Sequence, residues 1–349
     1  MADEERSRAR ASIADVAVLA GVSLGTVSNV LNHPSRVSAV TAQKVARAMA
    51  KLDYVPDGNA RSLAAGSNRT IGIVLPDLSN SLFVDVARGA EDSADRAGHA
   101  LMIANSDTRL ERESRHLRTF AQARVAGILL TLNDEDHYEA IVGDTPKNLP
   151  TVMLNLAVPV SRSCSVSVDN ELGGWMATTH LIETGRRRLV FVGGPESLDP
   201  VRDRSKGFAR AVGERSLQPV RAISPPGVNR ADGWGVGTAL VDEIRAGVVD
   251  GIFAATDLLA AGIVQALTAA GVQVPEDVAV VGYDNNQAAW DSPIPITTIA
   301  QPGEDMGRVG ADLVLEEAQR RFEHQHRSLV LEPSLVVRAS SRPSARPPG

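Results

Sequence analysis

Hydrophobic residues near the start of the chain recur at intervals of three and four, which is the period of an amphipathic helix. Three such segments follow one another, and they predict helices over Ile13–Ala20, Leu24–Asn32 and Ala39–Leu52. Gly21 and Ser23 mark the short turn between the first two helices, because glycine commonly ends a helix and serine commonly caps one. The pattern therefore predicts a small all-α domain with a helix-turn-helix at its start.

The second of these helices has two different faces. Its apolar stripe consists of Val27, Val30 and Leu31. Its opposite face carries Gly25, Ser28, Asn29 and Asn32. Because the major groove of DNA is wide enough to admit a helix, small polar residues on a free face can approach base edges there. By periodicity alone, a three-helix bundle that binds nothing stays open as the alternative.

From Ile71 onward, short apolar runs alternate with helical patterns, which is typical of βαβ units and parallel sheets. The runs are IGIVLP, ALMIANSD, AGILLT, TVMLNL, SVSVD, LVFVGGP, GIFAATD, VAVVGYDN and ITTIA. They are too many for one sheet of usual width and divide near 168–170, so we expect an α/β body of two doubly wound lobes. A ligand would lie between the lobes, at the carboxyl ends of the strands.

Composition supports a chain of several domains. It has 349 residues, of which 43% are hydrophobic and 3% aromatic, and cores rich in Val, Ala, Leu and Ile suit buried parallel strands. Residues 1–69 hold nine Lys or Arg against six Asp or Glu, so a net charge of +3 sits on the head and −9 on the body, within an overall −6. Cys164 is the only cysteine, so we expect no disulfide and a buried, inert thiol.

The segment SIADVAVLAGVSLGTVSNVLNHPSRVSAVTAQKVARAMAKLDYVPDGNARSLAAG resembles the headpiece of the LacI family of repressors. The resemblance places a DNA-binding domain at 12–56. It implies base contacts by Leu24, Gly25 and Asn29 and contacts to the DNA backbone by Ser23, Thr26, Ser28 and Asn32. Asn29 can pair with adenine and Leu24 can meet a thymine methyl, whereas Gly25 offers no side chain. A G-x-S-x-G motif over Gly21–Gly25 is not interpreted as a nucleophile elbow, because a helix precedes it instead of a strand.

The segment 57–68 is too short for a stable isolated helix in water, and the same resemblance makes it a hinge helix or linker. In the family, two hinges fold side by side on the operator, and a leucine wedges into the minor groove. The residues that match here are Asn59, Ala60, Arg61 and Leu63. A plain flexible linker is the alternative.

The body resembles the periplasmic sugar-binding fold that the family shares, over almost the whole chain from Ser12 to about Ser340. The resemblance places the effector-binding domain at 69–340, with an N-lobe of about 69–168 and 299–329 and a C-lobe of about 169–298 and 330–340. It implies effector contacts by Leu82, Phe83, Asn155, Arg204, Trp234, Asp257 and Asp284. Arg204 and Asp284 on opposite sides of a ligand suit a neutral polyhydroxyl molecule, although a simple pair across the cleft is the alternative.

Further expectations concern the tails, metals and location. We expect disordered tails at 1–11 and 341–349, and the second lacks the heptads of a coiled coil, so a homodimer is favoured. His324 and His326, with Glu323, could bind a metal, but a solvated helix end is the preferred interpretation, so neither metal nor cofactor is expected. The charged start MADEERSRAR and the lack of a long apolar run predict a cytoplasmic protein without membrane contact.

These observations predict a transcriptional regulator without enzymatic activity. It would repress by binding a pseudo-palindromic operator as a homodimer, under allosteric control by a small effector, a sugar or sugar derivative. A cytosolic sugar-binding protein with a vestigial headpiece is the alternative. Whether the effector is an inducer or a co-repressor, and whether some promoters are activated, stays open.

Overall fold

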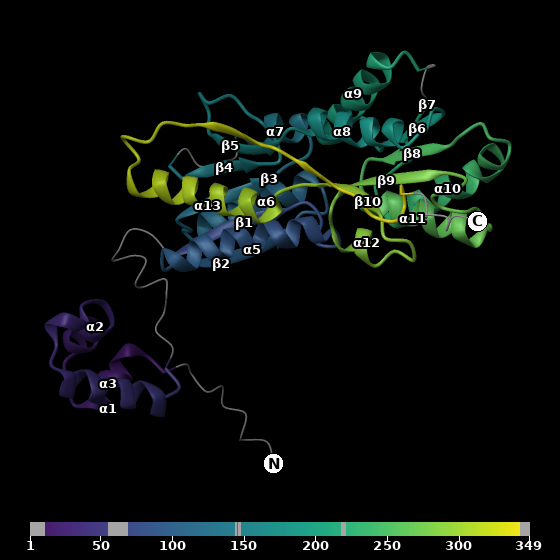
Figure 1. Ribbon diagram of the computed structural model, residues 1–349. Helices are drawn as coiled ribbons and strands as arrows, with labels where there is room; N and C mark the ends of the chain where they lie inside the picture. The colour runs from purple at the N-terminus through teal and green to yellow at the C-terminus, as the bar shows by residue number, and fades with distance from the viewer. Residues whose placement is uncertain (1–10, 55–68, 144, 146–147, 218–220, 343–349) are drawn as a thin grey trace. The chain divides into compact units, whose positions relative to one another are not determined.

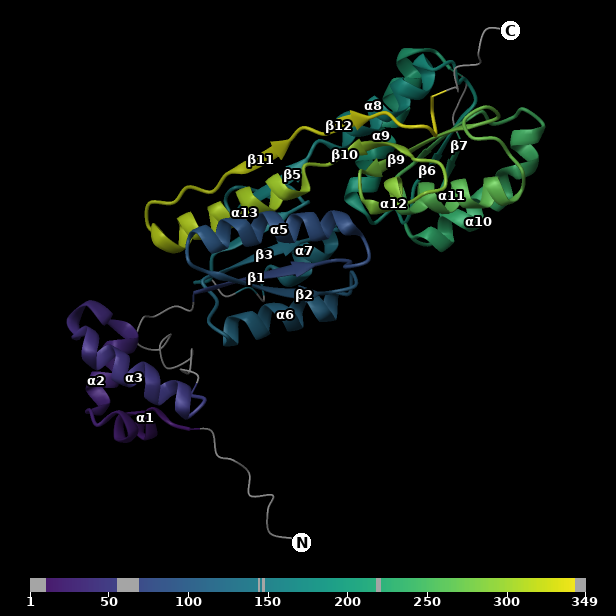
Figure 2. The ribbon, with the colours of Figure 1, turned by 60° about the horizontal axis from the view of Figure 1, so that its bottom comes forward.

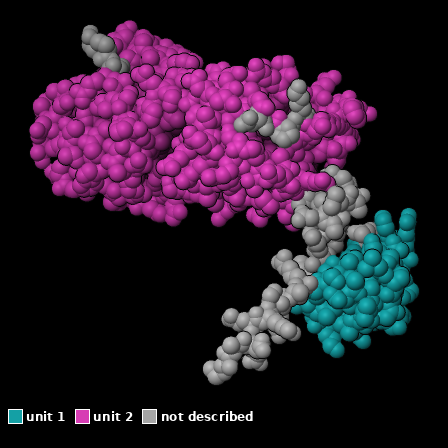
Figure 3. All heavy atoms as spheres, turned by 180° about the vertical axis from the view of Figure 1, so that it is seen from behind, with its two compact units in different colours: residues 1–68 teal, residues 69–349 magenta. Residues whose placement is uncertain are grey.

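The computed structural model describes residues 11–54, 69–143, 145, 148–217 and 221–342. The chain divides into two units, 1–68 and 69–349, which Figure 3 shows in different colours. Within the described residues, no single helix is long and apolar enough to cross a membrane. Only the segments Ile13–Ala20 and Leu24–Leu31 pass that test together, as a pair bent by 105°.

The described part of the first unit is all-helical, as predicted. It contains α1 (Ile13–Ala20), α2 (Leu24–Asn32), a 3-10 turn (Pro34–Arg36) and α3 (Ala39–Lys51). Ser12 and Asp15 form the expected capping box, and Gly21 ends α1 in a left-handed conformation. The buried core consists of Val16, Ala17, Val27, Val45 and Ala48. Each helix thus contributes one apolar face to a small shared core.

The second unit holds two sheets, each covered by helices, so the predicted two-lobed α/β body is confirmed (Figure 1). The N-lobe consists of β1 (Thr70–Leu75), α5 (Ser81–Arg96), β2 (Ala100–Asn105), α6 (Leu110–Gln122), β3 (Gly127–Thr131), α7 (Glu135–Ile141), β4 (Thr151–Leu154), β5 (Cys164–Val168), α13 (Gly303–Gln319) and β11 (Ser328–Leu331). Its strands are all parallel, in the order β11-β5-β4-β3-β1-β2.

The C-lobe repeats this architecture. It consists of α8 (Asn170–Glu183), β6 (Leu189–Val192), α9 (Asp199–Glu214), β7 (Arg221–Ile223), α10 (Arg230–Arg245), β8 (Gly251–Ala254), α11 (Asp257–Ala269), β9 (Ala279–Asp284), α12 (Gln287–Trp290), β10 (Thr297–Ala300) and β12 (Ser334–Val336). The order is β12-β10-β9-β8-β6-β7, and only β12 runs antiparallel to its neighbour. The central strands are buried on both faces, which explains their unbroken apolar runs.

The chain crosses between the lobes three times, after β5, after β10 and after β11. Ile299 and Ala300 pair with β9 in the C-lobe, so the second crossing follows β10. Val330 and Leu331 pair with β5 in the N-lobe, so the third crossing follows β11. Figure 2 shows both connections beside each other, as the run from β10 into α13 and from β11 into β12.

The prediction of a disordered tail over 341–349 is wrong for its first residue, Ser341. Ser341 is fully buried, and its Oγ lies 2.6 Å from Thr297 Oγ1 and 2.7 Å from His180 Nε2. The adjacent Ser340 is buried too and donates to the Val280 carbonyl at 2.5 Å. These short polar side chains fix the end of the described chain to the C-lobe sheet. The tails 1–10 and 343–349 and the hinge 57–68 lie outside the described residues.

Candidate functional site

In the first unit, α2 presents its polar face outward. Ser23 caps the helix by accepting a hydrogen bond from the Thr26 amide at 3.1 Å, and the two hydroxyl oxygens lie 2.9 Å apart. Leu24, Gly25 and Asn29 are exposed, whereas Val27 is buried beneath them. The helix can therefore approach another molecule with this face without disturbing its own core.

The residues expected to contact the DNA backbone differ in exposure. Ser23 is exposed, and Thr26 and Ser28 are partly exposed on the same helix. Asn32 is the last residue of α2, but its side chain lies outside the described part of the structure. The hinge residues Asn59, Ala60, Arg61 and Leu63 also lie outside it.

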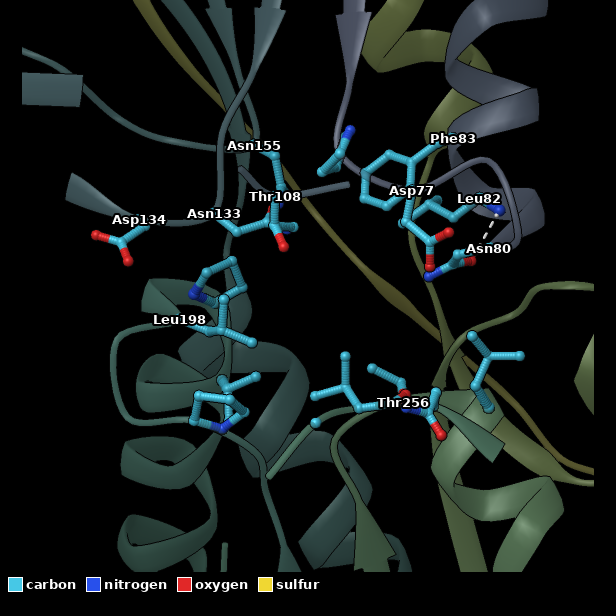
Figure 4. A pocket seen from close by; sticks show the side chains of 18 of the residues that line it. Asp77, Asn80, Leu82, Phe83, Thr108, Asn133, Asp134, Asn155, Leu198 and Thr256 are labelled. Atoms are coloured by element: carbon cyan, nitrogen blue, oxygen red, sulfur yellow. Dashed lines mark hydrogen bonds between the residues drawn. The ribbon is translucent and has the colours of Figure 1, made fainter. Parts of the chain in front are cut away.

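In the second unit, a cavity of about 440 Å³ lies between the lobes (Figure 4). Its walls come from segments that follow the carboxyl ends of parallel strands, as predicted for this fold. On the N-lobe side these include Asp77 after β1, Thr108 after β2 and Asn133 after β3. On the C-lobe side, Leu198 and Thr256 face them across the cavity.

Five of the seven residues expected to contact the effector line this cavity, and two do not. The five are Leu82, Phe83, Asn155, Arg204 and Asp284. Trp234 lies on α10, away from the cavity, with 47% of its surface exposed. Asp257 is fully buried beneath the cavity wall, where it accepts hydrogen bonds from Thr298 Oγ1 at 2.6 Å and the Asn286 amide at 2.8 Å. The predictions for Trp234 and Asp257 as lining residues are therefore wrong.

Arg204 is held rigidly by the C-lobe. Its guanidinium carbon lies 3.7 Å from the centre of the Tyr283 ring, and only 4% of the residue is exposed. Nε donates to Asn170 Oδ1 at 2.9 Å and Nη1 donates to the Ala255 carbonyl at 2.5 Å. Because these contacts fix the side chain, Arg204, which lines the cavity, can meet a ligand without further loss of rotamer freedom.

Asp284 is the partner of Arg204 and belongs to the same lobe. Arg204 Nη2 lies 3.7 Å from Asp284 Oδ1 within the C-lobe, so the two side chains neither face each other across a ligand nor pair across the cleft. Burial raises the pKa of Asp284, while Arg204 and hydrogen bonds from Asn80 and Gln301 oppose that rise. Asp284 also has a left-handed φ of 111°, as does Asn285 with 58°, so the end of β9 is strained at the cavity.

Hydrogen bonds join the two lobes beside the cavity. Asn80 Nδ2 donates to Asp284 Oδ2 at 3.1 Å, and Asn286 Nδ2 donates to Asn80 Oδ1 at 2.9 Å. The Gln287 amide donates to Ser81 Oγ at 2.8 Å, and the Asp199 amide donates to the Asn133 carbonyl at 2.9 Å. These hydrogen bonds thus hold the lobes together at two places beside the cavity.

Several residues that line the cavity were not predicted from the sequence. Asn80 follows β1 within the segment PDLSNSLF, and Thr108, Asn133 and Thr256 each follow a strand end, which is the signal that identifies them. A buried acid was not predicted either: Glu113 is 2% exposed, lines the cavity and lies 3.0 Å from His137 Nδ1 through Oε2. Burial raises the pKa of Glu113, and His137 opposes the rise.

The prediction that His324 lies at a solvated helix end is also wrong. Helix α13 ends at Gln319, and the His324 side chain is 1% exposed, next to Glu316 and not Glu323. Its Nε2 lies 3.2 Å from the thiol of Cys164. Cys164 is buried, as expected, and burial raises the pKa of its thiol.

Each of the two units matches a model of a known protein family. The model of "Bacterial regulatory proteins, lacI family" matches residues 12–57, and that of "Periplasmic binding protein-like domain" matches residues 178–341. The HTH-type transcriptional repressor PurR of Aliivibrio fischeri strain MJ11 is 31% identical over 95% of this chain and 98% of its own. The ribose operon repressor of Escherichia coli K12 is 33% identical over 95% and 100%.

The fold of this chain is also similar to that of a solved structure. The Lac repressor dimer bound to operator and the anti-inducer ONPF matches with a TM-score of 0.81 and 26% identity, over 95% of this chain and 99% of that one. The exposed face of α2, the cavity between two α/β lobes and these full-length relatives lead to one conclusion: the chain belongs to the LacI family of bacterial DNA-binding transcriptional regulators.

Proposed function

We propose that this chain is a repressor that binds a pseudo-palindromic operator as a homodimer, and that a small molecule in the cavity between its lobes controls that binding. The observation that carries the proposal is the exposed Asn29 on α2, in a chain whose second unit contains a cavity lined by both polar and apolar residues. An exposed amide on a recognition helix can pair bidentately with adenine. In this account the protein works in the bacterial cytoplasm and acts by binding, without catalysis.

The dimer is supported by an exposed apolar edge. β2 lies at the edge of the N-lobe sheet, where Met102 is 39% exposed and Ile103 is 49% exposed. An uncovered strand edge with apolar side chains favours pairing with another chain. Two copies joined at β2 would supply two α2 helices, which is what an operator of two inverted half-sites requires.

The cavity chemistry favours a neutral ligand rich in hydroxyl groups. Asn155 Oδ1 and Gln301 Oε1 are buried acceptors without a hydrogen-bond partner, while Arg204 supplies a fixed donor. Hydroxyl groups both donate and accept, so they satisfy both kinds of group. Phe83 adds an apolar wall. We therefore propose a sugar or sugar derivative, a proposal that the name of the ribose operon repressor supports.

Control would pass through the contacts between the lobes. A ligand that changes the Asn80–Asp284 contact alters the angle between the lobes, and with it the separation of the two DNA-binding units in the dimer. In this proposal the hinge residues around Leu63 fold against the minor groove only at one separation.

A selection from random double-stranded DNA tests the proposed DNA recognition. The full chain should enrich an inverted repeat, and binding to that repeat should weaken steeply as salt rises. The Leu24→Ala and Asn29→Ala variants should change the enriched bases. Enrichment of no motif by the wild-type chain would contradict operator recognition.

Calorimetric titration of the full chain tests the proposed effector class. Pentoses, hexoses and disaccharides form one set of ligands, and nucleobases form another. We expect one sugar to bind with a stoichiometry of one per chain, and Asn155→Ala to weaken that binding by at least about ten-fold. Binding of a nucleobase alone would overturn the sugar proposal and leave DNA recognition intact.

A further inference from the structure

Three residues with metal-binding side chains meet at the end of α13 and in the loop that follows it. One possible ligand atom from each of Glu317, His324 and His326 lies within 4.8 Å of the other two. The cluster lies beside the start of β5, at the amino ends of the N-lobe strands. The effector cavity lies at the opposite edge of the same sheet, at the carboxyl ends. The cluster is therefore separate from the effector site.

His326 is oriented by a backbone carbonyl. Its Nδ1 lies 3.1 Å from the Val160 oxygen, and because a carbonyl only accepts, Nδ1 carries the hydrogen and donates it. In the neutral ring, Nε2 then carries the lone pair. This nitrogen points toward Glu317, whose Oε1 lies 3.8 Å away. A histidine that donates one ring N–H to a carbonyl and keeps the other nitrogen free is the usual arrangement of a metal ligand.

His324 has the same arrangement in a more buried position. Its Nε2 lies 3.2 Å from Cys164 Sγ, a sulfur that also accepts the Arg327 amide at 3.3 Å. Because this sulfur can accept a hydrogen bond from Nε2, His324 can hold its hydrogen there and keep the lone pair on Nδ1. Nδ1 is buried without a hydrogen-bond partner, and the side chain is 1% exposed. A buried nitrogen in this state costs free energy unless another group binds it.

The carboxylates complete the cluster. Glu317 Oε2 is buried and has no hydrogen-bond partner. Glu316 also contacts His324: its Oε1 lies 3.5 Å from His324 Nδ1, while its Oε2 is paired with Arg327. The two His–Glu distances, 3.5 and 3.8 Å, are at or beyond the limit of hydrogen bonding, so direct His–Glu hydrogen bonds do not account for the orphaned atoms.

We propose that Glu317, His324 and His326 form a binding site for a divalent transition metal ion of the zinc type. Two imidazole nitrogens and one carboxylate are a common three-ligand set for zinc, with water or Glu316 in the fourth position. Metal–ligand bonds of about 2.1 Å hold tetrahedral ligand atoms about 3.4 Å apart, so the cluster needs only a small closure around the ion. Cys164 orients His324 through Nε2 and does not bind the ion itself.

A bound ion would connect helix α13 to the loop that leads into β11. The cluster joins Glu317 of α13 with His324 and His326, while His324 contacts the first residue of β5. Metal binding to the folded chain stabilises it by mass action. The site would therefore stabilise the amino-end edge of the N-lobe, the edge at which β1 begins.

Titration of the tag-free, chelator-treated full chain with Zn²⁺ tests the proposal. Calorimetry should show one site per chain, and Zn²⁺ should raise the unfolding temperature. His326→Ala and the isosteric Glu317→Gln change partly exposed ligands and should each weaken Zn²⁺ binding at least about ten-fold. His99→Ala, which changes a histidine of the same lobe outside the cluster, should leave it unchanged. Wild-type affinity in both ligand variants, or no Zn²⁺ binding by the wild-type chain, would overturn the proposal.

Co²⁺ used in place of Zn²⁺ tests the ligand set. Tetrahedral Co²⁺ absorbs visible light, and a thiolate ligand adds an intense near-ultraviolet charge-transfer band. We expect the visible bands without the thiolate band, and the same spectrum for Cys164→Ser. A thiolate band that Cys164→Ser removes would contradict the proposed ligands.

Discussion

Asn80 of the N-lobe donates a hydrogen bond to Asp284 of the C-lobe at 3.1 Å, across the rim of the effector cavity. The same amide accepts from Asn286 at 2.9 Å and caps helix α5 by accepting from the Leu82 amide at 3.1 Å. Asp284 in turn contacts Arg204 on its own lobe. One side chain thus connects the start of α5 to the carboxylate that a bound effector would meet.

A charge at position 80 should open the lobes. Asn80→Asp keeps a good N-cap for α5 but places a second carboxylate against Asp284, and like charges at this distance repel. We expect a larger radius of gyration in small-angle X-ray scattering than for Asn80→Ser, which keeps the cap without the charge. Identical scattering from the two variants would show that this contact does not hold the lobes together.

The buried Asp257 should make stability depend on pH. Burial, with the charge of Asp284, raises the pKa of Asp257 well above its ordinary 3.8. A carboxyl with a raised pKa in the folded state favours folding fully below 3.8, and this contribution is lost as pH rises through the folded pKa. Asp257→Asn cannot ionise, so its stability relative to wild type in urea unfolding should rise as the pH is raised above 3.8 and through the folded-state pKa of Asp257. A constant difference would contradict the raised pKa.

Close helix packing makes Gly307 sensitive to size. A Cβ at Gly307 in α13 would lie 1.8 Å from the Val86 carbonyl oxygen of α5. Gly307→Ala must therefore push the two helices apart, and we expect a loss of about 1–3 kcal/mol in the free energy of unfolding. Gly235→Ala in α10 is the matched control, because its Cβ would meet nothing within 4 Å, and it should be neutral or stabilising by about 0.5–1 kcal/mol. Equal effects would show that the helices adjust freely.

Asn29 should carry base discrimination. Replacing it with alanine should cost about 1–3 kcal/mol of preference for one base pair in each half-site, with little change in folding, because the side chain is exposed. Anisotropy titrations with single-base operator variants measure this. Gln43→Ala, which removes an exposed amide on α3, should keep the wild-type preference. An unchanged preference in Asn29→Ala would remove this residue from the reading face.

Local patterns predicted the elements well, because the bounds depend on neighbours in sequence. Capping by Ser12 and Ser23 and the apolar periodicity fixed α1 and α2 to the residue, and α3 ended one residue earlier than expected. The exact residues at which the chain crosses between the lobes depend on the strand pairing of β10 and β11, which local patterns do not reveal.

The ligand site was predicted less completely, because side-chain direction depends on contacts distant in sequence. Asp257 directly follows Thr256, a lining residue, yet it turns inward to Thr298 and Asn286. Trp234 lies on the exposed part of α10. The burial of His324 by a cysteine 160 positions away could not be deduced from a local polar run.

The binding of the full chain to a selected inverted repeat, compared with the same bases in scrambled order at one salt concentration, tests operator recognition most directly. We predict that the repeat binds at least about 10³-fold more tightly, and that reversing one half-site removes most of that preference. Equal affinity for the repeat and the scrambled DNA would contradict it.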